Sequence, residues 1–370
     1  MPLISVSFFA VIALAVIYVS RRTAQLFNSR SVWFYVFFFL LLVYCFAGMM
    51  LIASPKAVTP LLHAVTVSGT NICGVLMYLF ASLVVTDIVR IFMHYSARKS
   101  CMIALAITLA ASLYSFVNAA VTRTRQTEIP IEGLSRDVTV AQLTDMHLGH
   151  FHGAKHVRKV VDMVNAANPD FVVITGDLFD SWYNRSAETI SALRNLNAPA
   201  FFIVGNHDVY VDADGVKELV RSLGNVRVLE NEVLYVAGVQ LVGLDYMAAD
   251  EKELNKFHFQ APYRNETIEQ VMGELSIEPS WPTVAIHHTP DGAEYVADAG
   301  VDLFLAGHTH GGQFFPVTII DRILFDHMRW LDKEGDMQVY VSCGTGTTGP
   351  QMRNGTMSEV TILKLIPNNN

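Results

Sequence analysis

The first 121 residues contain four apolar runs, each about as long as a membrane span, and no other feature limits the possible fold as strongly. The runs cover about residues 2–20, 32–53, 71–93 and 102–121. A spanning helix needs about 20 mostly apolar residues. A cleaved signal peptide would instead be a single short apolar run behind a basic leader. The sequence therefore predicts a multi-pass membrane region of four helices over residues 1–121.

The charged residues divide the chain at the same point. The first 121 residues hold seven basic side chains and one acid, Asp87, which leaves 19 basic and 33 acidic residues for the remainder, a net charge of −14. Affinity for nucleic acid comes mainly from Lys and Arg side chains that neutralise phosphates, so nucleic acid is not an expected partner. A negatively charged substrate would need a local positive source, and bound metal ions are the obvious candidate.

Asp87 lies inside the third apolar run, three residues before Arg90. Residues at this spacing share a helix face, so we expect the two side chains to pair near the membrane interface. A functional carboxylate within the membrane is the alternative interpretation.

The basic residues of the membrane region predict its orientation. The loops after the first and third runs carry most of them: Arg21, Arg22, Arg30, Arg98 and Lys99. The loop after the second run has only Lys56. Because basic loops stay in the cytoplasm, both termini and the second domain are predicted to be extracytoplasmic. Arg123 and Arg125, just after the fourth run, count against this orientation.

Beyond about residue 134, apolar runs of strand length, such as FVVIT, AFFIV and TVAIH, alternate with amphipathic stretches. In one stretch, the residues Val157, Val160, Val161 and Val164 recur at i, i+3, i+4 and i+7, which predicts a helix. Similar patterns occupy about residues 186–197 and 214–223. Strands alternating with helices predict an α/β domain with buried sheets. We place a linker at 122–137 and the globular domain at 138–366.

Polar motifs follow directly after five of the predicted strands. They are Thr144-Asp145-Met146-His147, Gly176-Asp177-Leu178-Phe179-Asp180, Gly205-Asn206-His207-Asp208, His287-His288-Thr289-Pro290 and Gly307-His308-Thr309-His310. Ligand sites in α/β sheets lie beyond the carboxyl ends of the strands. Carboxylate, amide oxygen and imidazole donors without sulfur suit divalent first-row metals and disfavour a structural zinc. A single such motif is weak evidence, but five in order predict a metal site.

The ordered motifs D-x-H, GD-x-x-D, GNHD, H-x-P and GHTHGGQ resemble those of the calcineurin-like metallophosphoesterase family, over about residues 138–366. Within that family the chain looks most like a membrane-associated branch that includes bacterial enzymes acting on UDP-diacylglucosamine and related lipid precursors. The resemblance implies an αββα sandwich, in which two packed mixed β-sheets are flanked by helices. It also implies a hydrolase of phosphodiester or pyrophosphate bonds with two divalent metal ions, for which Mn, Fe and Zn are the candidates.

The resemblance also implies a role for each motif residue. Asp145, His147 and His310 would bind the first metal, and Asn206, His288 and His308 the second. Asp177 would bridge the two, and His207 would act beside the transferred phosphate. A general acid at that position contributes about 10²–10⁴ in rate. The H-x-P pattern selects His288, which leaves His287 as a strand residue that points the other way.

The sequence leaves the substrate open. The apolar segment Phe314–Leu331 is expected either to pack into the core or to form an apolar lip that faces the bilayer. A lip would suit a lipid-linked substrate such as UDP-diacylglucosamine. The alternatives are a phosphodiesterase for soluble nucleotides and a catalytically silent membrane protein that senses metal or phosphate. Arg353, near the C-terminus, is expected either beside the site or in a surface pair.

Overall fold

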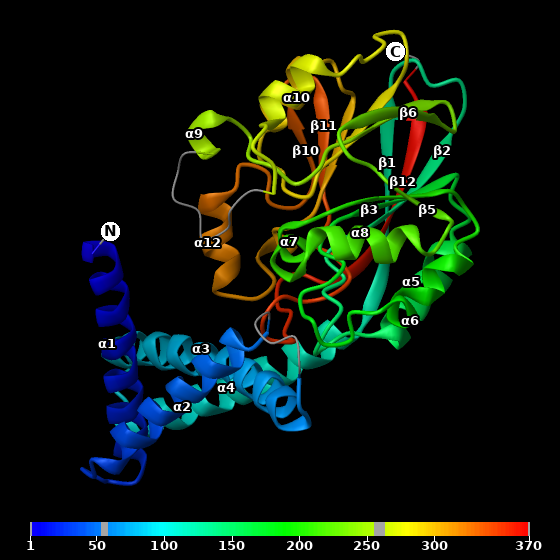
Figure 1. Ribbon diagram of the computed structural model, residues 1–370. Helices are drawn as coiled ribbons and strands as arrows, with labels where there is room; N and C mark the ends of the chain where they lie inside the picture. The colour runs from blue at the N-terminus through cyan, green and yellow to red at the C-terminus, as the bar shows by residue number, and fades with distance from the viewer. Residues whose placement is uncertain (1, 53–57, 255–262, 369–370) are drawn as a thin grey trace. The chain divides into compact units, whose positions relative to one another are not determined.

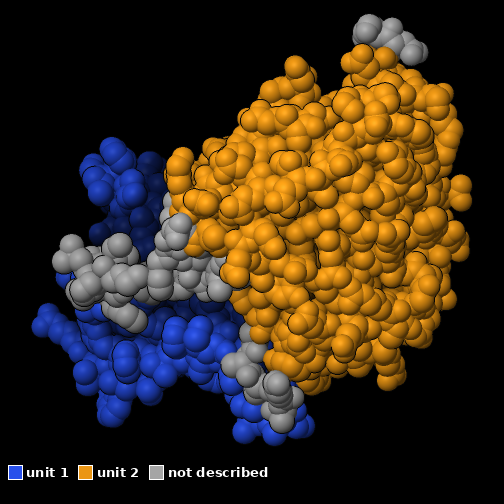
Figure 2. Space-filling view, turned by 45° about the horizontal axis from the view of Figure 1, so that its top comes forward, with its two compact units in different colours: residues 1–118, 349–354 blue, residues 119–348, 355–370 orange. Residues whose placement is uncertain are grey.

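The computed structural model describes residues 2–52, 58–254 and 263–368, with side chains from residue 12 onward. It divides into two compact units, shown separately in Figure 2. Unit 1 consists of residues 1–118 and 349–354, and unit 2 of residues 119–348 and 355–370. Each unit is described by itself below.

Unit 1 is helical (Figure 1). Its helices are α1 (Pro2–Leu26), α2 (Trp33–Met50), α3 (Pro60–Met93) and α4 (Ala97–Ala120). In the described part of the chain, α2, α3 and α4 are long and apolar enough to cross a membrane. The chain is therefore a membrane protein. The predicted count of four spans is not confirmed, because α1 is helical but is not among these three candidates.

A buried polar network joins three of these helices. The predicted pair of Asp87 and Arg90 is present at 3.7 Å, but the closer basic partner of Asp87 is Arg22, at 2.6 Å. The hydroxyls of Tyr18 and Ser100 also donate to Asp87, each at 2.8 Å. Since α1, α3 and α4 each contribute a member, the carboxylate holds the helices together, which favours the structural interpretation.

The short segment 349–354 belongs to unit 1 although it lies far along the chain. The backbone N–H of Gln351 donates to Asn71, and that of Arg353 donates to the carbonyl of Ser115, at 2.9 and 3.0 Å. Arg353 is fully buried in these contacts. Its burial contradicts the predicted surface pair, and a place beside the site stays a prediction.

Unit 2 contains two six-stranded sheets. The first has the order β1-β12-β2-β3-β4-β5, with β1 (Thr122–Ile131), β12 (Ser358–Pro367), β2 (Val138–Leu143), β3 (Phe171–Thr175), β4 (Ala200–Ile203) and β5 (Val226–Val228). The second has the order β10-β11-β9-β8-β7-β6, with β10 (Trp330–Glu334), β11 (Met337–Val341), β9 (Leu303–Ala306), β8 (Thr283–Ile286), β7 (Val239–Gly243) and β6 (Glu232–Val236). Both sheets mix parallel and antiparallel pairs.

Helices cover the outer faces of both sheets (Figure 1). On the first sheet these are α5 (Ala154–Ala166), α6 (Ala187–Ile190) and α8 (Ala213–Arg221), and on the second sheet α10 (Ile268–Glu274) and α11 (Ala293–Asp298). The unit also contains the short helices α7 (Asn206–Val211), α9 (Glu251–Leu254) and α12 (Val317–Leu324). One core lies between the sheets, and two more lie beneath the helices. The four valines of the predicted helix in α5 are all buried. The predicted two mixed sheets flanked by helices are thus present.

The structure differs from the prediction at residues 122–137, which were expected to form a linker. Thr122–Ile131 is instead strand β1, paired in parallel with β12 over its whole length. The segment alternates polar and apolar residues only weakly, so its sequence resembles a loop, and distant pairing with β12 decides its structure. Only Val121 separates helix α4 from strand β1.

Candidate metal centre

The five polar motifs converge because their strands are neighbours. β2, β3 and β4 are adjacent and parallel in the first sheet, and β8 and β9 are adjacent and parallel in the second. Parallel neighbours end at the same edge, so each loop that follows a strand delivers its side chains there. This edge forms a buried cluster of His, Asp and Asn side chains, as the strand-end pattern predicts.

One donor group consists of Asp145, His147 and His310. The Nε2 atoms of His147 and His310 are 3.0 Å apart. The Oδ1 atom of Asp145 lies 3.5 Å from His310 Nε2 and 3.8 Å from His147 Nε2. All three side chains are buried, and their potential ligand atoms lie within 4.8 Å of one another. The arrangement leaves room for one shared cation among three donors.

A second donor group surrounds Asn206. Its Oδ1 atom lies 2.9 Å from both His288 Nε2 and His308 Nδ1. His288 Nδ1 donates to the carbonyl of Thr175 at 2.8 Å, which turns Nε2 toward the group. A ring orientation fixed through the second nitrogen is typical of histidine metal ligands.

Asp177 lies between the two groups. Its Oδ2 atom is 3.2 Å from His288 Nε2 and 3.7 Å from His147 Nε2. Its Oδ1 atom accepts the backbone N–H of His207 at 2.8 Å. One carboxylate thus faces a donor of each group, which is the position a shared ligand requires.

The backbone of the cluster is strained. Five cluster residues have a positive φ: Asp145 (51°), His147 (45°), Asp177 (53°), His308 (69°) and His310 (51°). Non-glycine residues rarely adopt this left-handed region, and each instance costs on the order of 1–3 kcal/mol. Strain of this kind concentrates at functional sites, where the surrounding structure enforces it.

Two glycines of the motifs are required by close packing. A Cβ atom at Gly205 would lie 2.2 Å from the Oδ1 atom of Asp177. A Cβ atom at Gly307 would lie 2.2 Å from the hydroxyl of Thr144 and 2.5 Å from Asp145 Oδ2. Both distances are far below contact, so only glycine lets these strands approach the carboxylates.

The two carboxylates of the cluster stay anionic although they are buried. Burial alone would raise the pKa of Asp145, but the charge of His310 and the neighbouring His147 ring hold it below its ordinary value. Burial opposes ionisation of Asp177 too, and the charges of His288 and His207 hold its pKa well below the ordinary value. Burial lowers the pKa of His308 to about 4, whereas at His288 the charge of Asp177 outweighs burial and raises the pKa to about 9. Anionic carboxylates and a neutral imidazole are the forms that bind metal.

The hydrogen bonds within the cluster leave donor capacity for an ion. In the described part of the chain, the Oδ1 atom of Asp145 is buried and has no hydrogen-bond partner. An unsatisfied buried carboxylate oxygen is costly unless a charged group binds it. Oxygen and imidazole donors without sulfur suit a divalent first-row metal. The residues present therefore fit such an ion.

His207 packs beside the first donor group. Its ring packs edge-on against the ring of His147, with centroids 4.7 Å apart, and it contacts Tyr210 at 5.4 Å. Burial lowers the pKa of His207 to about 4. The side chain is half-buried, whereas most of the other cluster side chains are fully buried. It is therefore accessible to a molecule that approaches the donors.

The neighbouring carboxylates have structural contacts. Asp208 accepts the backbone N–H groups of Leu178, Phe179 and Gly205, at 2.9–3.2 Å, so it caps helix α7 and does not orient His207. Asp180 Oδ2 lies 3.8 Å from His147 Nδ1, on the far side of that ring from the cluster. Asp180 is therefore placed to orient the ring of the donor His147 and not to bind an ion itself.

Other histidines lie apart from the donor groups. His287 points the other way, as predicted, with its Nδ1 atom 3.0 Å from the carbonyl of Thr289. The His150 ring stacks on Tyr183 with centroids 4.9 Å apart. His152 Nε2 lies 3.4 Å from the hydroxyl of Thr347.

Sequence reasoning missed Tyr210. Its hydroxyl accepts from Asn206 Nδ2 at 3.4 Å. The signal was available, because Tyr210 stands four residues after Asn206 on helix α7, and residues at that spacing share a helix face.

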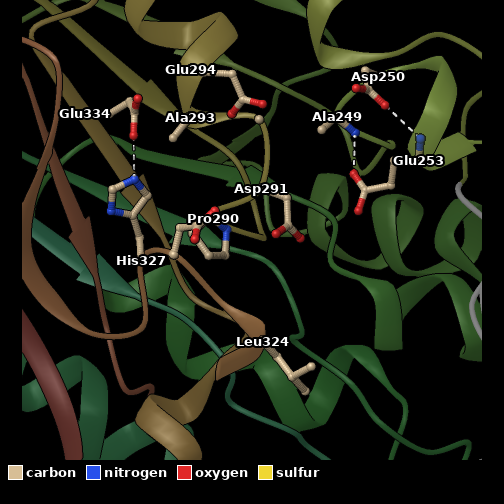
Figure 3. A pocket seen from close by; sticks show the side chains of 12 residues that line it. Ala249, Asp250, Glu253, Pro290, Asp291, Ala293, Glu294, Leu324, His327 and Glu334 are labelled. Atoms are coloured by element: carbon tan, nitrogen blue, oxygen red, sulfur yellow. Dashed lines mark hydrogen bonds and ion pairs between the residues drawn. The ribbon is translucent and has the colours of Figure 1, made fainter. Parts of the chain in front are cut away.

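A separate acidic cavity of about 260 Å³ lies in unit 2 (Figure 3). Its carboxylates are Asp250, Glu253, Asp291, Glu294, Asp326 and Glu334. His327 is held between Asp332 and Glu334, at 3.0 and 3.1 Å. Burial and the charge of Glu253 raise the pKa of Asp291 to about 6. This lining of carboxylates would repel a phosphate group, so the cavity does not suit an anionic substrate.

Two layers of mixed sheet, with His, Asp and Asn donors buried at their common edge, define a metal-binding α/β domain. The family model for calcineurin-like phosphoesterases matches residues 138–312. The chain is also 30% identical to an uncharacterized metallophosphoesterase of Aquifex aeolicus, over 70% of this chain and 97% of that protein. The chain belongs to the calcineurin-like phosphoesterase family.

Other relatives are longer than this chain. The chain is 32% identical to a transmembrane protein with metallophosphoesterase domain from Danio rerio, over 72% of this chain and 63% of that protein. It is 29% identical to an uncharacterized metallophosphoesterase of Helicobacter pylori strain J99, over 66% of this chain and 64% of that protein. The chain thus spans less than two thirds of these two relatives.

Proposed function

We propose that the chain is a membrane-anchored hydrolase that cleaves a phosphodiester or pyrophosphate bond with two divalent metal ions. The observation that carries the proposal is Asp177, whose carboxylate faces His288 on one side and His147 on the other. Two separate donor groups that share one carboxylate suit two neighbouring cations. Membership of the calcineurin-like phosphoesterase family supports the same chemistry.

Within this proposal each residue has a role. Asp145, His147 and His310 would hold one ion, Asn206, His288 and His308 the other, and Asp177 both. Bound cations would supply positive charge for the phosphoryl oxygens and lower the pKa of water from 15.7 to about 7. His207 would act beside the transferred phosphate, since its ring packs against His147 and lies within reach of Asp177. To donate a proton to the leaving oxygen it would need the negative charge of a bound phosphate to raise its pKa from about 4.

Metal removal tests the activity. Purified full-length chain in detergent is expected to hydrolyse a generic aryl phosphodiester with added Mn²⁺, Fe²⁺ or Zn²⁺. Activity should disappear after treatment with a chelator and return when the metal is restored. A metal-loaded, folded chain that hydrolyses neither phosphodiesters nor pyrophosphates would instead be a silent metal or phosphate sensor.

The substrate is further proposed to carry an apolar tail. Helix α12 follows the cluster residue His310 closely, and among its described side chains none is fully buried. Ile323 is 80% exposed and Leu324 is 67% exposed. The next residue, Phe325, packs its ring against His308 with centroids 5.8 Å apart. An exposed apolar helix next to the donor groups supports the lip that was one of two predictions for this segment.

The rest of the segment Phe314–Leu331 behaves differently. Phe314 is buried, and Trp330 packs partly into the core between the sheets while its ring lies under the Arg125 guanidinium at 3.9 Å. Outside α12, the exposed apolar side chains of the segment are Phe315, which is 43% exposed, and Leu331, which is 41% exposed. We limit the proposed lip to α12 and Phe315, which follow His310 closely.

The tail proposal predicts selective effects of changes in α12. Ile323→Ser together with Leu324→Ser should lower kcat/KM for an acylated phosphodiester by about 30-fold or more, since each aliphatic side chain contributes roughly 1 kcal/mol or more when a tail covers it. The rate on the deacylated counterpart should not change. Tyr235→Ser, at an exposed position on β6, is the control. Equal rates on both substrates in the unmodified chain would point to a soluble nucleotide or diester.

We also propose that unit 2 is extracytoplasmic, on the distribution of basic loop residues. Alkaline phosphatase fused after Asn370 is expected to be active. A cytoplasmic fluorescent tag that fluoresces there would reverse the orientation.

A further inference from the structure

A cavity of about 760 Å³ in unit 1 lies at one end of its helices, separate from the metal centre. The C-terminal end of α1 and the loop after it contribute Arg21, Gln25 and Arg30. The start of α2 contributes Tyr35, and the start of α4 contributes Arg98. The loops after the first and third helices thus meet at one end of the unit and enclose a common space.

The lining of this cavity carries unbalanced positive charge. Three guanidinium groups line it, and no carboxylate does. Within the described part of the chain, no carboxylate lies within 4 Å of the guanidinium of Arg21, Arg30 or Arg98. The nearby Asp87 is already paired with Arg22 and Arg90. The three arginines therefore lack an internal counterion and attract an anion from outside.

Other groups of the cavity are also hydrogen-bond donors. The side-chain oxygen of Gln25 accepts from Arg22, which leaves the Gln25 amide N–H groups to donate. Helix α4 is 24 residues long and begins at the cavity, so the positive end of its dipole faces the same space. Guanidinium groups bind phosphate oxygens with two parallel hydrogen bonds. The guanidinium groups, the Gln25 amide and the start of α4 together form a set of donors that suits a phosphate group.

The position of the cavity indicates that the phosphate belongs to a lipid headgroup and not to a free anion. It lies at the ends of helices long enough to span a membrane, and Trp33 in the first turn of α2 is 72% exposed. Exposed Trp and Tyr residues mark the level of the lipid headgroups. Basic pockets between spanning helices bind anionic headgroups, and the basic loops place this end at the cytoplasmic leaflet, which is the anionic one. A volume of 760 Å³ is within the range of ligand pockets.

We infer that this cavity binds the phosphate-bearing headgroup of an anionic phospholipid. The site is independent of the metal centre and of the proposed hydrolase activity. Its ligand is a resident lipid and not the substrate, because none of the lining residues belongs to the donor groups in unit 2.

Native mass spectrometry of the full-length chain tests the inference. In neutral detergent with equal amounts of phosphatidylglycerol and phosphatidylcholine, the chain is expected to retain phosphatidylglycerol preferentially. Each arginine should contribute about fivefold, so the triple variant Arg21→Gln, Arg30→Gln, Arg98→Gln should bind roughly 100-fold more weakly. Hydrolysis of an aryl phosphodiester and the thermal unfolding midpoint should be unchanged.

The adjacent residue provides a matched control. Lys99→Gln removes the same charge at the same level of α4, but Lys99 does not line the cavity. Arg98→Gln should weaken retention about fivefold and Lys99→Gln by less than about twofold. Equal losses in the two variants would mean diffuse attraction to an anionic surface and would overturn the site. This single-residue pair decides the question even where the triple variant fails to fold.

Competition separates the two sources of phosphate. Millimolar inorganic phosphate or glycerol phosphate should leave the retained phosphatidylglycerol in place, because the acyl chains hold the lipid as well. Complete displacement by inorganic phosphate would assign the cavity to a soluble anion and reject the lipid. Equal retention of phosphatidylcholine and phosphatidylglycerol in the unmodified chain would reject it as well.

Discussion

Asp177→Asn should abolish turnover and lower the amount of metal bound to the purified chain. Asp177 is the carboxylate that lies within 3.2 Å of His288 and 3.7 Å of His147. Asparagine has the same shape and can still accept the backbone N–H of His207, so the loop should persist. The shared negative charge is lost, and the two proposed cations would repel each other without it. The loss should exceed the roughly 10–100-fold seen when a residue behind a metal ligand is replaced.

Asp180→Asn is the matched control for this change. Asp180 lies three residues further along and contacts His147 through the other ring nitrogen, at 3.8 Å. Its replacement should therefore cost no more than the 10–100-fold typical of an outer partner. Metal content from elemental analysis and kcat on an aryl phosphodiester are the two measurements. Two metals per chain and a near-normal rate in Asp177→Asn would reject the bridging role.

Strand-end motifs made the donor cluster predictable from the sequence. Asp145, Asp177 and Asn206 follow strands that are too apolar to be anything but buried, and parallel neighbours must end at one edge. The strand-end pattern therefore predicted that these side chains would lie close together, whereas the role of each residue was implied only by the family resemblance and stays a prediction. The valine spacing of α5 likewise predicted a helix, because it places the valines on one face, and that face is buried in the structure.

Features that depend on distant partners were not predictable in this way. The sequence of strand β1 resembles a linker, and its strand structure depends on pairing with β12, which lies more than 200 residues later in the chain. Asp87 was expected to pair with its helix neighbour Arg90, but Arg22 from another helix lies closer. The exposure of Ile323 could not be inferred either, since the same apolar pattern fits a core helix. Each case requires knowledge of what packs against the segment.

His207→Ala should lower kcat by about 10²–10⁴ and leave the metal content nearly unchanged. His308→Ala should instead deplete one metal, because His308 Nδ1 is 2.9 Å from Asn206 Oδ1 within the second donor group. His207 could also be a metal ligand, because one of its ring nitrogens lies within 4.8 Å of donor atoms of His147 and Asp177. The two variants test which role it has. We favour a role beside the phosphate because the family motifs assign the ligand positions to the other donors, and half-burial does not decide, since His308 is half-buried too.

The leaving group of the substrate separates a proton donor from a metal ligand. A nitrophenolate departs without a proton, so a general acid matters little for an aryl ester, whereas an alkyl alkoxide needs the proton in the transition state. His207→Ala should therefore slow an alkyl phosphodiester far more than a nitrophenyl one. A metal ligand would affect both substrates alike, because either substrate needs the same cations. Equal losses on the two substrates, together with loss of one metal, would make His207 a ligand, and the proton would then have to come from another group near the cluster, such as Tyr210.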